Sequence, residues 1–159
     1  MRSQMVAANQ CHNDDAILEP GEYAFRQEVS GRVFTATVPA LVCPVCGEKV
    51  IDGPLLLQKE REVAAALARE GPVDGDSFRF MRTTLRLRAA DLAALLDVAP
   101  ETISKWENGK NPVLRTAWLV VADMALENAD EDGRHPLRER LQSLAKGKRA
   151  RKRVRLDAA

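Results

Sequence analysis

The stretch that most constrains this chain runs from Ala89 to Gly109, AADLAALLDVAPETISKWENG, and predicts two short helices joined by a tight turn. In the first helix, Leu92 and Leu96 are spaced to share one apolar face. Pro100 suits the first position of the second helix, because the N–H that proline lacks has no partner there. Asn108-Gly109 ends that helix, since both residue types tolerate the left-handed conformation at a helix C-terminus.

The second helix has one face suited to a core and one suited to a polar partner. Ile103, Trp106 and Glu107 share one side at 100° per residue, and we expect Ile103 and Trp106 to be buried. The opposite side and its flank carry Glu101, Thr102, Ser104, Lys105 and Asn108. Thr, Ser and Lys hydrogen-bond to base edges or phosphates, and Glu accepts from cytosine N4. The pattern predicts a helix that enters a DNA major groove; the alternative is a helical hairpin with a solvated polar face.

These residues resemble the helix-turn-helix of the Xre/Cro-like repressors. Their pattern is LAxxLGVSxxTISxWExG, and it occurs here as LAALLDVAPETISKWENG. Asp97 replaces the turn glycine and visits the left-handed conformation less readily. Ala99 replaces the N-cap serine, so the second helix loses a cap worth roughly 1 kcal/mol.

A CxxC sequence near the N-terminus predicts half of a metal site. Cys43 and Cys46 in CPVCG are spaced so that both thiolates reach one zinc ion at about 2.3 Å. Cys11 supplies a third ligand, and the fourth is Asp14 or His12, with Asp14 the easier geometry because adjacent side chains rarely aim at one ion. The alternative is a degenerate knuckle held by packing alone. Three cysteines fit a reducing compartment, and we expect a cytoplasmic protein.

The region around the CxxC resembles the zinc-binding module of the MqsA antitoxin family (the YgiT-type zinc finger). Residues 23–29 and 32–38 favour strands, and Ser30-Gly31 between them predicts a β-hairpin. In that family a CxxC, a hairpin and VPxxxCxxCGE precede an Xre-type helix-turn-helix, and VPALVCPVCGE stands here at the matching place. Asp14 replaces one cysteine of the first pair. The resemblance implies bound zinc, a toxin neutralised by the N-terminal module, and autoregulation of an operator.

The expected fold class is α+β, with a small zinc-ribbon-like β-hairpin module followed by an all-α helix-turn-helix domain of the Xre/Cro-like kind. The predicted division is a zinc-finger-like module with a bridging helix at 1–70, a linker at 71–76, the DNA-binding domain at 77–145 and a basic disordered tail at 146–159.

Further helices are expected at 55–70, at 77–87 with Asp76 or Ser77 as N-cap, at 113–128 and at 136–145. Surplus apolar residues on 113–128, and the helix at 136–145, predict either a homodimer surface matching a palindromic operator or simple core packing.

Positive charge is concentrated in one segment rather than absent. The net charge is +1, yet residues 146–155, KGKRARKRVR, hold seven Lys or Arg and no acid. Such a run is typical of a disordered, solvated segment, and it also predicts an arm that adds salt-dependent affinity for phosphate. The chain has no apolar run of membrane-spanning length and no signal-like leader, so we expect no membrane partner.

The residues expected to carry function lie mainly on the second helix. The resemblance implies that Lys105 reads the operator, with Thr102 and Ser104 as base or phosphate contacts and Glu101 favouring cytosine. Weaker candidates for backbone contact are Lys110, Asn111, Arg82 and Thr83, and Glu107 is expected to pair with an arginine of a neighbouring helix. Neither His12 nor His135 accompanies a nucleophile signature, and no Gly-rich phosphate loop occurs, so we expect no enzyme. Two functions remain: a dimeric repressor of its own promoter, and a toxin-binding antitoxin.

Overall fold

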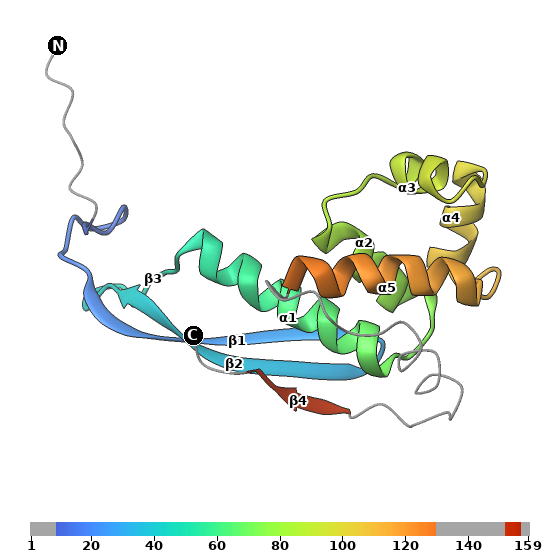
Figure 1. Cartoon of the computed structure of the whole chain (residues 1–159). Coiled ribbons are helices and arrows are strands. Elements are labelled where there is room, and N and C mark those ends of the chain that lie inside the picture. Colours follow the sequence, from blue (N-terminus) through green and yellow to red (C-terminus); the bar gives the residue numbers. More distant parts are fainter. Residues whose placement is uncertain (1–8, 130–151, 157–159) are drawn as a thin grey trace, which may run out of the picture.

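The computed structural model describes residues 9–129 and 152–156. A long β-hairpin is followed by five helices and a short strand near the C-terminus (Figure 1). The elements are β1 Glu19–Val29, β2 Arg32–Val42, β3 Lys49–Val50, α1 Gly53–Glu70, α2 Gly75–Thr84, α3 Ala89–Leu95, α4 Pro100–Glu107, α5 Arg115–Ala129 and β4 Arg153–Arg155. This order confirms the expected fold class, a β-hairpin sheet followed by helices that include a helix-turn-helix.

The hairpin has two strands of 11 residues each, joined by the predicted two-residue turn. Ser30 and Gly31 both have positive φ, 51° and 71°, as the tight turns that suit the strand twist require. The second strand was predicted to span 32–38, directly before Pro39, but β2 continues through Pro39 to Val42. The register explains why: the pair Val29 and Arg32 closes the turn, so Pro39 takes a position whose N–H is not used by β1.

Two short strands pair with the other edge of β2. β3 pairs antiparallel near the end of the hairpin that carries the CxxC, and β4 pairs parallel near the turn. The Val33 N–H donates to the Lys152 carbonyl, and the Leu156 N–H donates to the Thr35 carbonyl, each at 2.7 Å. Residues 146–159 were predicted to be disordered, so the position of 152–156 is a correction.

The physical reason for that correction is an alternation hidden inside the basic run. Val154 and Leu156 fall on one side of the strand and are only 9% and 8% exposed, whereas Arg153 and Arg155 face outward. Alternation of this kind is the signature of a half-buried strand. The prediction of a disordered tail rested on the number of basic residues and did not take this alternation into account. The remainder of the predicted tail and the predicted helix at 136–145 lie outside the described residues.

One hydrophobic core joins the hairpin to all five helices and to β4. Phe34 of β2, Leu67 of α1, Phe78 of α2 and Trp118 of α5 are each fully buried in it. α1 lies along the hairpin and packs against α5 and α2 (Figure 1). The segment 71–76, predicted to be a linker between two domains, therefore does not separate two cores.

The hairpin turn is also hydrogen-bonded to the start of α2. Asp74 is the N-cap: its carboxylate accepts from the Ser77 N–H at 2.9 Å and from the Ser30 hydroxyl at 2.7 Å. The prediction of Asp76 or Ser77 as the cap was wrong, because α2 begins at Gly75, inside the predicted linker. This contact ties the β-hairpin to the first helix of the helix-turn-helix region. No helix in 9–129 has the length and apolar character needed to cross a membrane.

Candidate DNA interface and metal centre

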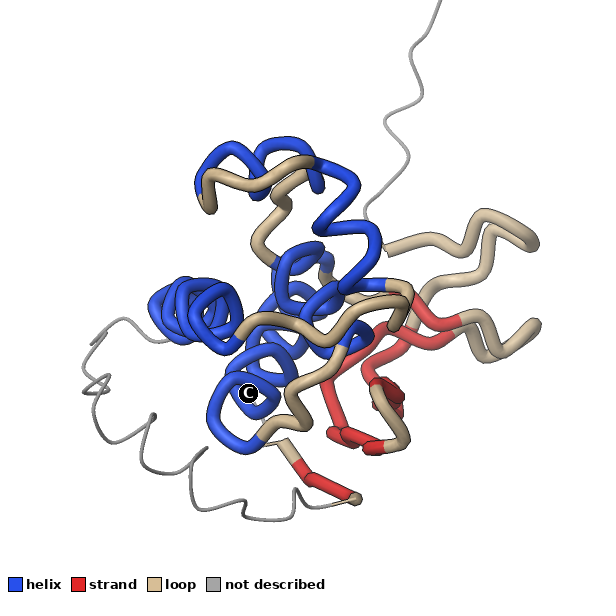
Figure 2. The backbone as a smooth tube through the Cα atoms, turned by 90° about the vertical axis from the view of Figure 1, so that its right-hand side faces the viewer, coloured by secondary structure: helices blue, strands red, loops and turns tan. Residues whose placement is uncertain are grey.

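The turn between α3 and α4 adopts the geometry that the sequence indicates. Asp97 has φ of 53°, so it takes the left-handed conformation for which the resembled pattern has glycine. Ala99 is the N-cap of α4 and makes no side-chain capping bond, as expected. Gly109 follows α4 with φ of 67°. Figure 2 shows this pair of short helices at one side of the helical layer.

The faces of α4 are divided as predicted. Ile103 is fully buried and Trp106 is 3% exposed, and the Trp106 ring meets Phe78 of α2 edge-on, with ring centroids 5.9 Å apart. The opposite face presents the exposed side chains of Glu101, Ser104, Lys105 and Asn108, with Thr102 half-buried at its flank. The helix is therefore anchored on one side and free on the side that carries the candidate base contacts.

The C-terminal end of α4 is held to α2 by a largely buried ion pair. Arg82 donates through Nη2 to Glu107 Oε2 at 3.0 Å and through Nε to the other carboxylate oxygen. Its Nη1 donates to the Leu87 carbonyl at 2.7 Å, so the same arginine also holds the loop before α3. The expected arginine partner of Glu107 is thus confirmed. Arg82 was also a candidate phosphate contact; its side chain is 11% exposed and its guanidinium is engaged internally, which corrects that expectation.

A close backbone approach completes this attachment. A Cβ built on Gly75 would lie 2.2 Å from the Trp106 carbonyl oxygen and 2.8 Å from that of Glu107. The positive N-terminal end of α2 therefore abuts the negative C-terminal end of α4, an arrangement that the helix dipoles favour. The sequence shows only a glycine in a turn-like segment, so its role in positioning α4 was missed.

The loop after α4 carries two of the weaker candidates. Lys110 and Asn111 are exposed, and both of their N–H groups donate to the Lys105 carbonyl, at 2.9 and 3.2 Å. Thr83 is exposed on α2, where its hydroxyl donates back to helix carbonyls.

Near the start of α3, Arg88 and Asp91 form an ion pair with two hydrogen bonds of 2.8 Å each, which raises the pKa of Arg88 and lowers that of Asp91.

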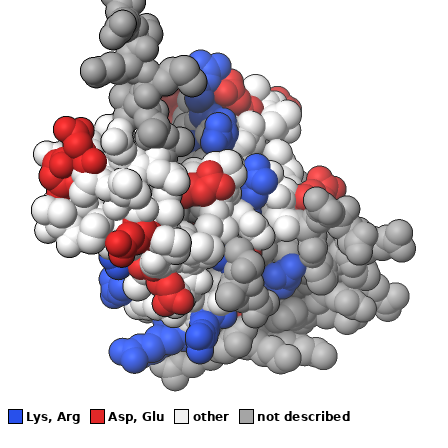
Figure 3. Space-filling view, turned by 90° about the vertical axis from the view of Figure 1, so that its left-hand side faces the viewer, with Lys and Arg blue, Asp and Glu red and all other residues white. Residues whose placement is uncertain are grey.

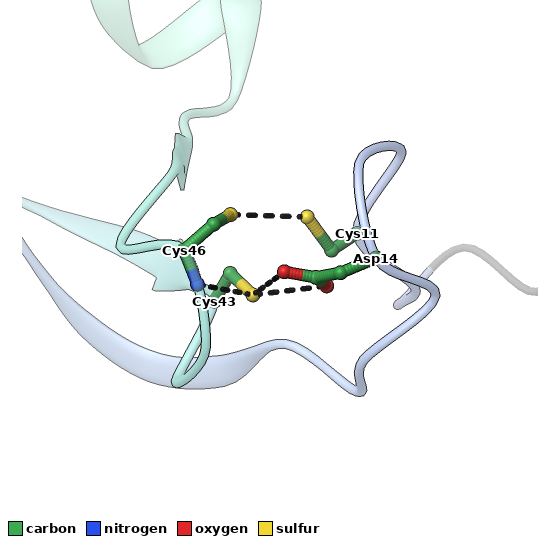
Figure 4. A group of neighbouring side chains, drawn as sticks. All are labelled: Cys11, Asp14, Cys43 and Cys46. Carbon is green, nitrogen blue, oxygen red and sulfur yellow. Dashed lines mark hydrogen bonds between the residues drawn. The ribbon is translucent and has the colours of Figure 1, made fainter.

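A second group of side chains lies at the far end of the hairpin (Figure 4). Cys11 and Asp14 come from the loop before β1, and Cys43 and Cys46 from the turn between β2 and β3. The four possible ligand atoms all lie within 4.8 Å of one another. His12, the alternative fourth ligand, is not part of this group. The structure thus brings together the four residues expected to bind metal.

The separations fit a tetrahedral ion. Bonds of about 2.3 Å to sulfur place two thiolates about 3.8 Å apart around one zinc ion. Cys11 Sγ lies 3.5 Å from Cys46 Sγ, and Cys43 Sγ lies 3.3 Å from both carboxylate oxygens of Asp14. Cys11 and Cys43 are buried, whereas Cys46 is exposed. Three thiolates and one carboxylate are a donor set that suits zinc better than calcium or magnesium.

The surroundings affect the two buried thiols differently. A hydrogen bond from the Asn13 N–H lowers the pKa of Cys11, but burial and the neighbouring thiols outweigh it and raise that pKa to about 12. Burial raises the pKa of Cys43, yet the N–H groups of Cys46 and Val45 point at its sulfur and lower the pKa overall. A cation at the centre would favour the thiolate form of both, because ligand deprotonation accompanies metal binding.

Comparison with known proteins supports the helix-turn-helix and extends no further. A helix-turn-helix family model matches residues 79–122, which include α3, α4 and the turn between them. No curated protein and no solved structure matches the chain. The matching model is of the Xre-like kind, a domain family of DNA-binding regulators. The chain therefore contains an Xre-like helix-turn-helix domain, which marks it as a DNA-binding transcription regulator.

Proposed function

We propose that this protein is a sequence-specific repressor of the antitoxin type that binds its own promoter as a homodimer. The observation that carries the proposal is the state of α4: its apolar side is locked in the core, and its outer side is free. The pair of Arg82 with Glu107 and the close approach at Gly75 both hold this helix from behind. A helix presented in this way can insert into a major groove as a rigid body.

Within α4, we assign the central role in reading DNA to Lys105, which is exposed in the last turn. Thr102 and Ser104 contact bases or phosphates, and Lys110 and Asn111 contact the backbone next to them. Glu101 is an exposed carboxylate in the first turn; it repels phosphate and accepts from a cytosine amino group, which favours cytosine in the operator. Two such helices, related by dimer symmetry, would read a palindromic operator.

We further propose that Cys11, Asp14, Cys43 and Cys46 hold a structural zinc ion. The support is the donor set and the separations described above. When bound, zinc would link the loop before β1 to the turn after β2 and stabilise this end of the hairpin. A site with four protein ligands leaves no open position for catalysis.

A second candidate function is neutralisation of a toxin by the N-terminal module, with DNA binding as autoregulation. The resemblance to the MqsA antitoxins supports it, and so does the apolar character of the metal-binding end. Ile17 is 70% exposed, Val45 is 73% exposed and Val50 is 41% exposed. Exposed apolar side chains at one end of a small protein are typical of a protein-binding surface.

The experiment that tests the repressor proposal is fluorescence anisotropy with the DNA upstream of the protein's own reading frame, compared with a scrambled duplex. We expect preference for the upstream duplex and loss of that preference in Lys105→Ala. The thermal midpoint of Lys105→Ala should stay near that of the wild type, because the Lys105 side chain is exposed. Equal affinity of the wild-type protein for both duplexes would refute sequence-specific autoregulation.

The antitoxin proposal needs a separate test. We would co-express the protein with any small reading frame that lies next to its gene and measure growth. Rescue of growth arrest by the wild-type protein, but not by a variant with Val45→Glu, would support neutralisation by the N-terminal module. Rescue that survives Val45→Glu, and also survives serine at all three cysteines, would exclude this end of the hairpin.

A further inference from the structure

The strand β4 gives the sheet a basic face that the helix-turn-helix does not use. Side chains alternate along a strand, so Phe34 and Val154, which pair in register, both lie on the core side. Arg153 and Arg155 therefore lie on the opposite side of the sheet, where both are exposed. The apolar half of β4 anchors the strand, and the anchored strand presents its arginines in fixed positions.

The pairing places these arginines beside other polar groups. Arg26 of β1, Thr35 of β2 and Arg155 of β4 form one row across the three strands. In the neighbouring row, Glu28 and Arg153 lie on either side of β2. We call this surface the open sheet face: Arg26, Glu28, Thr35, Arg153 and Arg155.

The positive charge of the open sheet face is not balanced within it. Arg26 pairs with Glu28 at 3.1 Å, and both side chains remain more than half exposed. Among the residues that the structure describes, no ion pair joins Arg153 or Arg155 to a carboxylate. Lys152, just before the strand, is also exposed. Arg153 and Arg155 are thus neighbouring exposed cations on one side of β4, an arrangement that suits a polyanion that covers them.

The open sheet face points away from the DNA-reading helix. The other face of the sheet packs into the core with the helices, and in Figures 1 and 2 β4 lies at the bottom of the molecule while α3 and α4 lie at the top. In Figure 3, Lys and Arg side chains gather along that bottom edge.

We propose that the open sheet face binds the phosphate backbone of duplex DNA, at a stretch other than the one that α4 enters. In this position the arginines contact phosphates and not base edges, so binding depends on charge and not on the DNA sequence. One protein molecule then joins two segments of DNA: α4 holds an operator, and the open sheet face holds a neighbouring segment. The second part of this statement rests on the proposed function of α4.

The test uses the full-length protein and a 20-base-pair duplex of random sequence, in anisotropy titrations over a salt series. The double variant Arg153→Gln with Arg155→Gln removes two charges and keeps the apolar anchor. Each lost phosphate contact lowers the slope of log affinity against log salt by about 0.9, so we expect a slope smaller by about 1.8. The matched variant Arg153→Lys with Arg155→Lys keeps the charge and should keep the slope. Lys49→Gln removes a charge at the metal-binding end and should also keep it.

A capture assay tests the joining of two segments. The upstream duplex is immobilised, saturated with protein and exposed to a fluorescent random duplex. We expect the wild type to retain the second duplex and the double glutamine variant to lose it, while both bind the first. An unchanged salt slope in the glutamine variant overturns the proposal. An equal decrease of the slope in the lysine variant also overturns it, as does tighter binding of an RNA of equal length than of the random DNA duplex. If the upstream duplex shows no preference over random DNA, the repressor proposal fails, and the slope comparison still decides the role of the open sheet face.

Discussion

Replacing Gly75 by alanine should displace α4, the helix proposed to read DNA, without changing any residue on its outer face. The added Cβ would lie 2.2 Å from the Trp106 carbonyl oxygen, whereas Cβ atoms keep at least about 3 Å from backbone, so α2 and the end of α4 must separate by nearly 1 Å. Overpacking of this kind costs roughly 1–3 kcal/mol. For a chain of 159 residues, each kcal/mol shifts the thermal midpoint by about 2–4 °C, which gives a decrease of about 2–12 °C.

Gly53 provides the matched control. It also lies in the first turn of a helix, but a Cβ built there meets nothing within 4 Å. Gly53→Ala should therefore be neutral or stabilising by less than about 1 kcal/mol, through the unfolded chain. Thermal and urea unfolding followed by circular dichroism compare the two variants, and anisotropy with the upstream duplex reports the position of α4. Equal stability of Gly75→Ala and Gly53→Ala would refute the close packing of α2 on α4.

Other expectations follow from the same contacts. Glu107→Gln leaves the Arg82 guanidinium without its charged partner and should destabilise the protein by about 3 kcal/mol; a decrease in the thermal midpoint below 3 °C would contradict this. Asp74→Ala removes the N-cap of α2 and its bond to the hairpin turn, and urea unfolding should show a loss of about 1 kcal/mol. Asp14→Cys completes a four-cysteine set and should raise zinc affinity in competition with a chelator, whereas Asp14→Ala lowers it. His12→Ala should leave zinc affinity unchanged, and an equal loss in both alanine variants would mean that His12 is a ligand.

Features encoded over short stretches were predictable from the sequence. The turn at Asp97, the buried side of Ile103 and Trp106, and the tight turn at Ser30 each depend on residues a few positions apart. The group of possible metal ligands was predictable for a different reason. Thiols at CxxC spacing have few uses other than metal binding, and Cys11 and Asp14 were the candidates that could complete a set of four ligands. This prediction depended on the chemistry of the side chains and not on hydrophobic periodicity.

Features that depend on distant residues were missed. Which acid caps α2 depends on Ser30, which lies far away in sequence and fixes Asp74 in place by a hydrogen bond. The role of Gly75 depends on carbonyls of α4, and no local pattern reports a close approach. The strand near the C-terminus required a partner edge on β2, and its apolar alternation was masked by seven basic residues in ten.

The core shared by the hairpin and the helices has a consequence for how this protein would be degraded. Because Phe34 and Trp118 belong to one cluster, opening the hairpin removes packing from the helices at the same time, and the hairpin and the five helices should unfold cooperatively. A protease that attacks the hairpin would then leave no folded fragment able to occupy DNA. If the protein represses its promoter as proposed, promoter occupancy would follow the level of intact hairpin, and cleavage of the hairpin would be sufficient to relieve repression.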